Sequence, residues 1–210
     1  QKKCGTNASS HVSHQDRLSL KEKVEKSTNR PRDIYSIPVV VHVLWRLPEQ
    51  NISEAQIQSQ IEVLNEDFRR MNTNYTHTPD VFKALSEDSE IEFCLALQDP
   101  FGNATNGMTR RQVTEKDIGS GANYYQSLNG GQDAWEVSRY LNIWVCEPGG
   151  DLFGFATLPG QANPSSSDGI VIDPKYFGRE GLATTSYPHH LGRTLTHEVG
   201  HYLGLLHPWG

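Results

Sequence analysis

Apolar residues are unevenly spaced along the chain, and their spacing predicts which segments are strands. Residues 35–47 read YSIPVVVHVLWRL, an almost continuous run of apolar and β-branched side chains that is typical of a strand. Pro38 indicates that this strand begins at a sheet edge or just after that residue, because proline cannot donate to a ladder. Shorter apolar runs predict further strands at residues 91–97, 108–114, 141–147, 153–158 and 169–173.

Two longer segments have the period of a helix instead. In residues 51–72, Ser53 and Gln56 have the spacing of a capping box. The apolar side chains that follow recur at helical spacing and form one stripe suited to core packing: Ile57, Ile61, Leu64, Phe68 and Met71. A second helix is predicted at residues 190–203. Shorter helical segments are predicted at residues 78–85 and 133–139.

This order of elements predicts an α/β (α+β) fold, in which a twisted mixed sheet of about five strands is packed by two long helices. Residues 1–33 differ from the rest, because they are rich in Lys, Ser, Asn and His and carry few large aliphatic side chains. Such a segment cannot build a core on its own. We therefore interpret residues 1–33 as a prosegment or a flexible N-terminal arm, and residues 34–210 as one folded unit.

The composition is that of a globular protein. Of 210 residues, 36% are hydrophobic and 21% are charged, and the net charge is −6. No apolar run approaches the ~20 residues needed to cross a bilayer, and no basic stripe is present that would favour nucleic acid as a partner. Nothing in the sequence indicates an oligomeric state.

The chain has three cysteines, so at least one is unpaired within it. Cys94 and Cys146 both lie in predicted strands. They either form a bridge or are two separately buried thiols, and the second alternative is favoured because a free cysteine packs like a small apolar residue. Cys4 lies in the N-terminal arm.

The residues that carry candidate chemistry lie in the run HEVGHYLGLLH at residues 197–207. On the predicted helix, His197 and His201 are four residues apart, so both rings lie on one face and can reach one ion. Gly204 tolerates a left-handed turn, which would bring His207 back as a third ligand. Three protein ligands and one open position are typical of a catalytic zinc site, whereas structural sites usually have four ligands.

Glu198 follows the first of these histidines and falls beside the predicted zinc rather than on it. There it can accept a proton from a zinc-activated water and pass it to a leaving amine. This predicts hydrolysis with Glu198 as the general base and without a covalent intermediate.

The remaining histidines are interpreted without a role in chemistry. His42 lies in a predicted strand and is expected to be a satisfied core or sheet-face residue. Five others lie in polar, turn-rich segments and are expected to be solvated: His11, His14, His77, His189 and His190.

The histidine pattern resembles the metzincin clan of zinc peptidases, and with three further stretches it resembles the pappalysin family. These stretches are LNIWVCE at residues 141–147, FGFATLP at residues 153–159 and LGLLHPWG at residues 203–210. The resemblance implies a secreted zinc endopeptidase that acts on protein or peptide substrates. It also implies that residues 34–210 form the upper subdomain of a metzincin-like catalytic domain, with a backing helix and a zinc-site helix. The lower C-terminal subdomain, where pappalysins bind calcium, is expected to be absent from this chain.

The same resemblance implies that the strand at residues 153–158 binds an extended peptide along its edge. The residues that would offer backbone groups to the peptide are Gly154, Phe155, Ala156 and Thr157.

Cys4 is a candidate for latency, because several metzincins are kept inactive by a prosegment thiolate in the open zinc position, and thiolate is a good zinc ligand. An incidental thiol and a lipid anchor are the alternatives, and Gln1-Lys2-Lys3 is unlike the apolar run that bacterial lipidation needs. A second class of function also stays open, in which the chain is a catalytically inactive latent or autolysed fragment that only binds zinc or protein.

Overall fold

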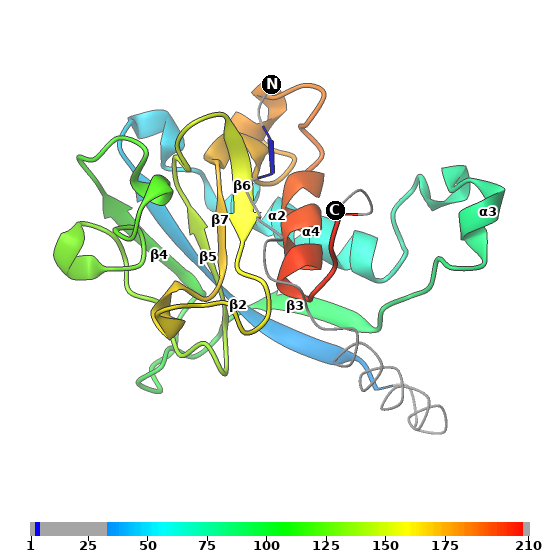
Figure 1. The fold of residues 1–210 in the computed structure, drawn as a ribbon, viewed down its shortest axis with the longest axis horizontal. Helices are drawn as coiled ribbons and strands as arrows, with labels where there is room; N and C mark the ends of the chain where they lie inside the picture. Colours follow the sequence, from blue (N-terminus) through cyan, green and yellow to red (C-terminus); the bar gives the residue numbers. More distant parts are fainter. Residues whose placement is uncertain (1–2, 5–32, 208–210) are drawn as a thin grey trace.

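A single mixed sheet forms the centre of the computed structural model, which describes residues 3–4 and 33–207 (Figure 1). The strand order is β1-β6-β7-β5-β2-β3, with β4 beside β2. The strands are β1 (Lys3–Cys4), β2 (Tyr35–Trp45), β3 (Ile91–Leu95), β4 (Met108–Gln112), β5 (Leu141–Val145), β6 (Leu152–Ala156) and β7 (Ile170–Ile172). All neighbours are parallel except β6 and β7, which confirms the predicted mixed sheet.

Helices are fewer than strands. They are α2 (Glu54–Phe68), α3 (Asp80–Lys83) and α4 (Arg193–Tyr202). Figure 1 shows that α3 lies on an extension that projects away from the sheet. Short 3-10 turns occur at Pro48–Gln50, Tyr75–His77, Ile118–Ser120, Ser127–Asn129, Ser165–Ser167, Pro174–Tyr176 and Gly181–Thr185.

The long strand β2 organises the sheet. Its first half pairs with β3 and its second half with β4 on the same side, while β5 pairs with its middle on the other side. The residues from Val39 to Leu44 are buried on both faces of the strand. This two-sided burial explains why the sequence is continuously apolar here instead of alternating.

Helices α2 and α4 lie next to each other on one side of the sheet (Figure 1). Ile57 and Leu64 of α2 and Leu195 and Val199 of α4 belong to one buried cluster with the inward side chains of the strands. The predicted capping box at the start of α2 is only half formed. The Ser53 side chain accepts a hydrogen bond from the Gln56 backbone amide at 3.1 Å, but the Gln56 side chain bonds to the carbonyls of Pro174 and Phe177 instead of returning to Ser53.

The end of α2 differs from the prediction. The helix stops at Phe68 because Arg70 has a left-handed backbone with φ 53°. Met71, which was expected to continue the apolar stripe, is therefore outside the helix and is 61% exposed.

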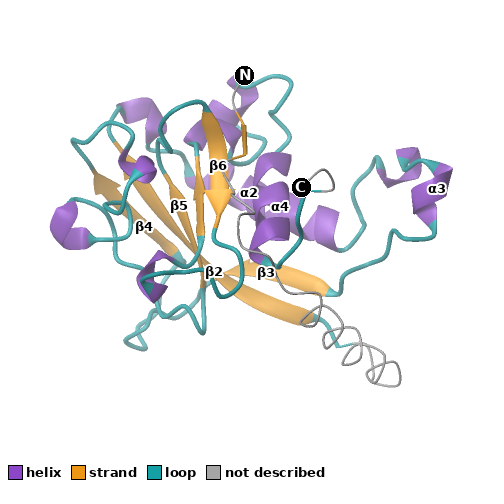
Figure 2. Ribbon diagram, in the orientation of Figure 1, coloured by secondary structure: helices purple, strands orange, loops and turns teal. Residues whose placement is uncertain are grey.

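The opposite side of the sheet is covered by loops and short turns rather than by long helices (Figure 2). A second buried cluster lies there around Trp144 and Tyr124. His42 packs beside it, with Nδ1 2.8 Å from the Thr109 hydroxyl and Nε2 3.1 Å from the Asn142 amide oxygen. The interpretation of His42 as a satisfied core residue is confirmed.

The helical turn predicted at residues 133–139 is only partly right, because the structure has a single turn at residues 137–139. The amide side chain of Asn142 bonds to both the N–H and the C=O of Trp135. These bonds occupy the backbone donor and acceptor that Trp135 would use in a helix, so they compete with a longer helix.

Both cysteines of the described domain are free, so the alternative of a bridge between them is wrong. Cys146 is buried, as expected for a thiol that packs like an apolar side chain. Cys94 is exposed, contrary to the prediction, because it lies on β3 at the end of the sheet, with Sγ 3.4 Å from the Ser36 hydroxyl.

The N-terminal arm is described only at Lys3–Cys4, where the backbone forms β1, and at Asp33. The sequence did not predict β1. His11 and His14 lie outside the described residues, and the proposed division at residue 33 stays a prediction. Among the described residues, no helix has both the length and the apolarity needed to cross a membrane.

Buried His42 makes stability depend on pH. Burial lowers the pKa of His42 to about 4, against the opposing effect of its hydrogen bond to Asn142. The unfolded chain binds this proton near pH 6.5 and the folded chain does not, so stability falls as the pH decreases from about 6.5 to about 4. We expect His42 to contribute a loss of about 2 kcal/mol between pH 7 and pH 5.

Urea denaturation of the chain and of His42→Gln at both pH values, in the presence of a chelator, measures this contribution. The variant should lose less stability on acidification than the parent. An equal loss in both proteins would contradict a buried neutral imidazole at this position.

Candidate metal centre

The zinc-site helix is α4, and its sequence places two histidines one turn apart. His197 and His201 lie on the same face, with their Nε2 atoms 3.0 Å from each other. His201 is almost fully buried, and His197 is exposed toward a cavity. The two rings therefore lie on one face of the helix, as their spacing predicts.

The end of α4 brings the third histidine back. Gly204 has φ +96°, a backbone that favours glycine, and its N–H bonds to the His201 carbonyl at 2.8 Å. The Leu205 N–H bonds to the Gly200 carbonyl at 2.9 Å, which completes a Schellman turn. His207 then lies with Nε2 3.1 Å from the Nε2 atoms of both His197 and His201.

Three ring nitrogens at these mutual distances converge on one point. Among the described residues, this is the one group of three His, Cys, Asp or Glu side chains that could hold a metal ion. A triangle of this size can be capped by an ion about 2.0–2.1 Å from each nitrogen, the distance of a zinc–imidazole bond. The donor set therefore fits zinc.

The tautomer of His201 is fixed by its other ring nitrogen. Nδ1 lies 2.7 Å from the Leu205 carbonyl oxygen, which can only accept, so Nδ1 carries the proton. Nε2 of the neutral ring therefore presents a lone pair to the cluster. Such a bond to the outer nitrogen is typical of metal-ligating histidines.

The other two rings are also favoured in the neutral form. Burial lowers the pKa of His197, and His201 and His207 lower it further. The pKa of His207 is lowered by burial and by His201. Since a metal ligand must be deprotonated at its donor atom, these shifts prepare the cluster for an ion at neutral pH.

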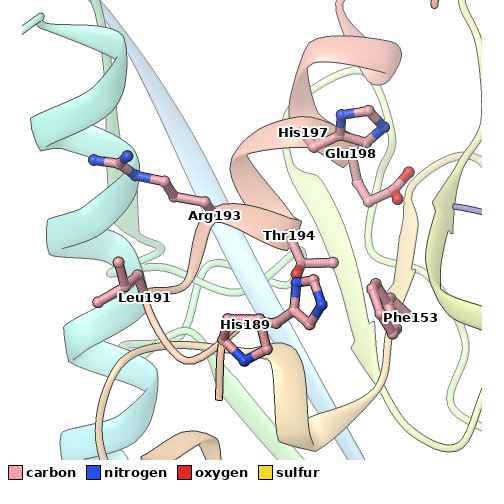
Figure 3. Close-up of a pocket in the computed structure, with 8 residues that line it drawn as sticks. Phe153, His189, Leu191, Arg193, Thr194, His197 and Glu198 are labelled. Carbon is pink, nitrogen blue, oxygen red and sulfur yellow. The ribbon is translucent and has the colours of Figure 1, made fainter. Parts of the chain in front are cut away.

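Glu198 is fully buried and lines a cavity of about 330 Å³ beside the histidine cluster. Figure 3 shows its carboxylate reaching from α4 toward the strand that carries Phe153. The other residues that line the cavity are Phe153, Pro188, His189, Leu191, Arg193, Thr194 and His197. A carboxylate in this position is next to the metal ligands without belonging to their cluster, as the sequence predicts.

His189 is a cavity residue that the sequence did not reveal. It is exposed, as expected, but it lines the cavity beside Glu198. The centre of its ring lies 4.7 Å from that of Phe153 and 6.0 Å from that of Tyr176. Its position before α4 is the one signal in the sequence that could have suggested this role. His77 is solvated as predicted, whereas His190 is half-buried against Tyr187.

The predicted substrate strand is β6, which contains Gly154, Phe155 and Ala156. On one side β6 pairs antiparallel with β7, and on the other side its edge pairs with the backbone of β1. Thr157 lies one residue beyond the strand and donates its amide to Gly169 at 3.0 Å. The register places Cys4 opposite Gly154, so Lys3–Cys4 lie along the same edge.

The comparisons with known proteins agree with this site. A model of peptidase family M43, described as pregnancy-associated plasma protein-A, matches residues 125–210. The structure of mature mirolysin from Tannerella forsythia, solved with a cleaved peptide, is 49% identical with a TM-score of 0.79 over 86% of this chain and 67% of that one. A promirolysin variant from the same organism is 43% identical with a TM-score of 0.82 over 100% of this chain and 71% of that one. The chain belongs to the pappalysin family.

Most curated relatives of this pappalysin match over shorter segments, although an extracellular metalloprotease of Colletotrichum graminicola is 25% identical over 99% of this chain and 65% of the relative. An extracellular metalloprotease of Arthroderma otae is 41% identical over 58 residues, which is 28% of this chain and 20% of the relative. The chain spans between 9% and 24% of the length of the first curated relatives that it matches.

Each of the three histidines is expected to be necessary for zinc. Replacing His197, His201 or His207 by Ala leaves two imidazoles, too few to hold the ion against solvent. Elemental analysis after gel filtration should show about one zinc per parent chain and almost none in each variant. His189→Ala is the matched control, because this residue lies in the adjacent cavity outside the cluster and should retain zinc. Full zinc content in His207→Ala would contradict the ligand set.

Proposed function

We propose that this pappalysin is a secreted zinc-dependent endopeptidase with Glu198 as its general base. The observation that carries the proposal is the convergence of three Nε2 atoms within 3.1 Å beside the buried carboxylate of Glu198. The names of curated relatives, which are extracellular metalloproteases, support both the activity and the secretion. The calcium sites implied by the family resemblance stay a prediction.

The chemistry follows from the positions of the side chains. A zinc ion held by the three histidines supplies a Lewis acid that lowers the pKa of water to about 7 and polarises a carbonyl. Glu198, fixed on the rigid helix α4, accepts the proton of the attacking water and later delivers it to the leaving amine. The same carboxylate thus moves one proton from nucleophile to leaving group, and no Ser or Cys nucleophile is needed.

The edge of β6 would orient an extended peptide. A peptide that binds as an added strand uses backbone hydrogen bonds on the free edge of β6. Phe153 and Thr157 bond through their backbone to the residues that flank β7, and the sides alternate along an antiparallel strand, so the backbone groups of Phe155 also face β7. Gly154 and Ala156 would therefore present their main-chain N–H and C=O to the peptide. The cavity next to Glu198 would then receive one side chain of the peptide. The mirolysin structure with a cleaved peptide supports a peptide as the ligand.

Substitution of Glu198 separates catalysis from zinc binding. Glu198→Ala removes the proton acceptor but none of the three ring nitrogens, so we expect zinc content to stay and peptide hydrolysis to fall by at least about 10²–10⁴-fold. The assay uses a quenched fluorescent peptide with the processed protein, with and without a chelator. Chelator-resistant cleavage, or cleavage retained in Glu198→Ala, would contradict the mechanism. Bound zinc with no turnover in the parent would instead favour the alternative of an inactive zinc-binding fragment.

The N-terminal arm is the proposed source of latency. The backbone of β1 pairs with β6 at Leu152 and Gly154, which is the edge that an extended substrate would need. The similarity to a promirolysin supports a form in which such an arm is still attached. We place Cys4 as the residue whose thiolate would fill the open zinc position, because thiolate is a strong zinc ligand.

A Cys4→Ala precursor tests this role. Without the thiolate, the described part of the arm keeps only the short β pairing of Lys3–Cys4, and we expect the uncleaved variant to hydrolyse peptide about tenfold faster than the uncleaved parent. Glu198→Ala in the same background controls for contaminating protease, and electrophoresis confirms that the arm is intact. Equal latency in parent and variant would contradict a role for Cys4.

A further inference from the structure

Helix α4 begins without a cap of its own. Its N-cap is Gly192, with φ 73°, which has no side chain to accept a hydrogen bond from the first turn. The first turn also contains no acidic residue. A helix start needs acceptors and favours negative charge, so this end of α4 must be held from elsewhere.

Helix α2 brings negative charge to this end of α4 through the side chain of Asp67. The Asp67 side chain is 12% exposed and uses both oxygens on the first turn of α4. Oδ2 accepts a hydrogen bond from the Thr196 hydroxyl at 2.9 Å, and Oδ1 lies 3.4 Å from the Arg193 guanidinium. In Figure 3 the Arg193 side chain points from the start of α4 toward α2.

These contacts come from helical positions that are next to the metal cluster. Thr196 directly precedes His197, and the Arg193 guanidinium also donates to the Asn74 side chain at 2.6 Å. Nearer the start of α2, the buried Gln60 side chain donates a hydrogen bond to the Gly192 carbonyl at 3.1 Å. The rotation of α4 about its axis is therefore fixed by polar bonds to α2, in addition to apolar packing.

We propose that Asp67 is a positioning residue for the metal centre and acts on His197 through Thr196. The inference rests on the proposed function of the cluster as a zinc site. A ligand ring must be held within about 0.5 Å and 10–20° of its productive geometry. A small rotation of the first turn of α4 moves the His197 ring relative to His201, which lies in the last turn and is bonded to the Gly204 turn that leads to His207.

The inference predicts an effect on zinc itself. Removal of a residue that orients a metal ligand without binding the metal typically lowers metal affinity by about 10–100-fold. We expect Asp67→Ala to weaken zinc binding by about this factor in competition with a chelator, and to change the visible absorption of the Co²⁺-substituted chain. Asp67→Asn keeps an oxygen for the Thr196 hydroxyl and should recover most of the affinity.

Thr196→Val tests the same path with almost no change in volume, and it serves if Asp67→Ala does not fold. Its affinity should fall like that of Asp67→Ala, and the double variant should lose little more, because both changes remove one bond. Glu62→Gln is the matched control, since Glu62 lies on the same helix and pairs with Arg179 away from α4. This control should bind zinc as the parent does.

Two results would overturn the inference, and they are distinguishable. If Asp67→Ala and Thr196→Val melt at lower temperature but keep the zinc affinity and the Co²⁺ spectrum of the parent, Asp67 only stabilises the fold. If the parent chain itself binds no zinc, the proposed function fails, and the inference fails with it.

Discussion

Three imidazole nitrogens that share one point are the constraint on which the rest of this site depends. The three Nε2 atoms lie 3.0–3.1 Å apart, and ligand lone pairs directed at one point from this distance repel unless a cation lies among them. The chain reaches this arrangement with a helix that places two rings and a glycine turn that returns the third. Because every ring belongs to one short segment, the orientation of α4 decides the geometry of the whole centre.

The orientation of α4 depends in turn on a row of polar side chains along α2. Gln56 and Gln60 are fully buried and bond to the backbone of residues 174–192, the segment that leads into the zinc-site helix. Gly178 and Gly181 pass so close to α2 that an added Cβ would meet it at 2.6 and 2.5 Å. Since an unpaired buried amide costs about 1–3 kcal/mol, these contacts specify one path for the segment.

The part of the site that lies within one short segment, residues 197–207, was largely predictable from the sequence. His197, His201, Gly204 and His207 follow from helical spacing and turn chemistry, and the apolar runs located all of the strands except β1. The supporting contacts were not predictable, because a glutamine on a helix usually indicates a solvated face and nothing in its own segment shows that a distant backbone will cover it. The place of His189 in the cavity was not predicted for the same reason, since its neighbours Phe153 and Tyr176 come from other elements.

The edge of β6 links the two functions proposed for the chain. Each backbone N–H or C=O on the free edge of β6 can bond to one neighbouring strand. Strand β1 and an extended substrate would therefore compete for the same groups at Gly154. Two residues of pairing are too few to hold a strand in place alone. A stable block would need a second attachment point, and two of the proposed metal ligands, His197 and His201, lie on α4, the helix that packs against β6. Coupling a weak strand contact to one strong ligand bond would give an arm that binds firmly while intact and leaves once it is cut.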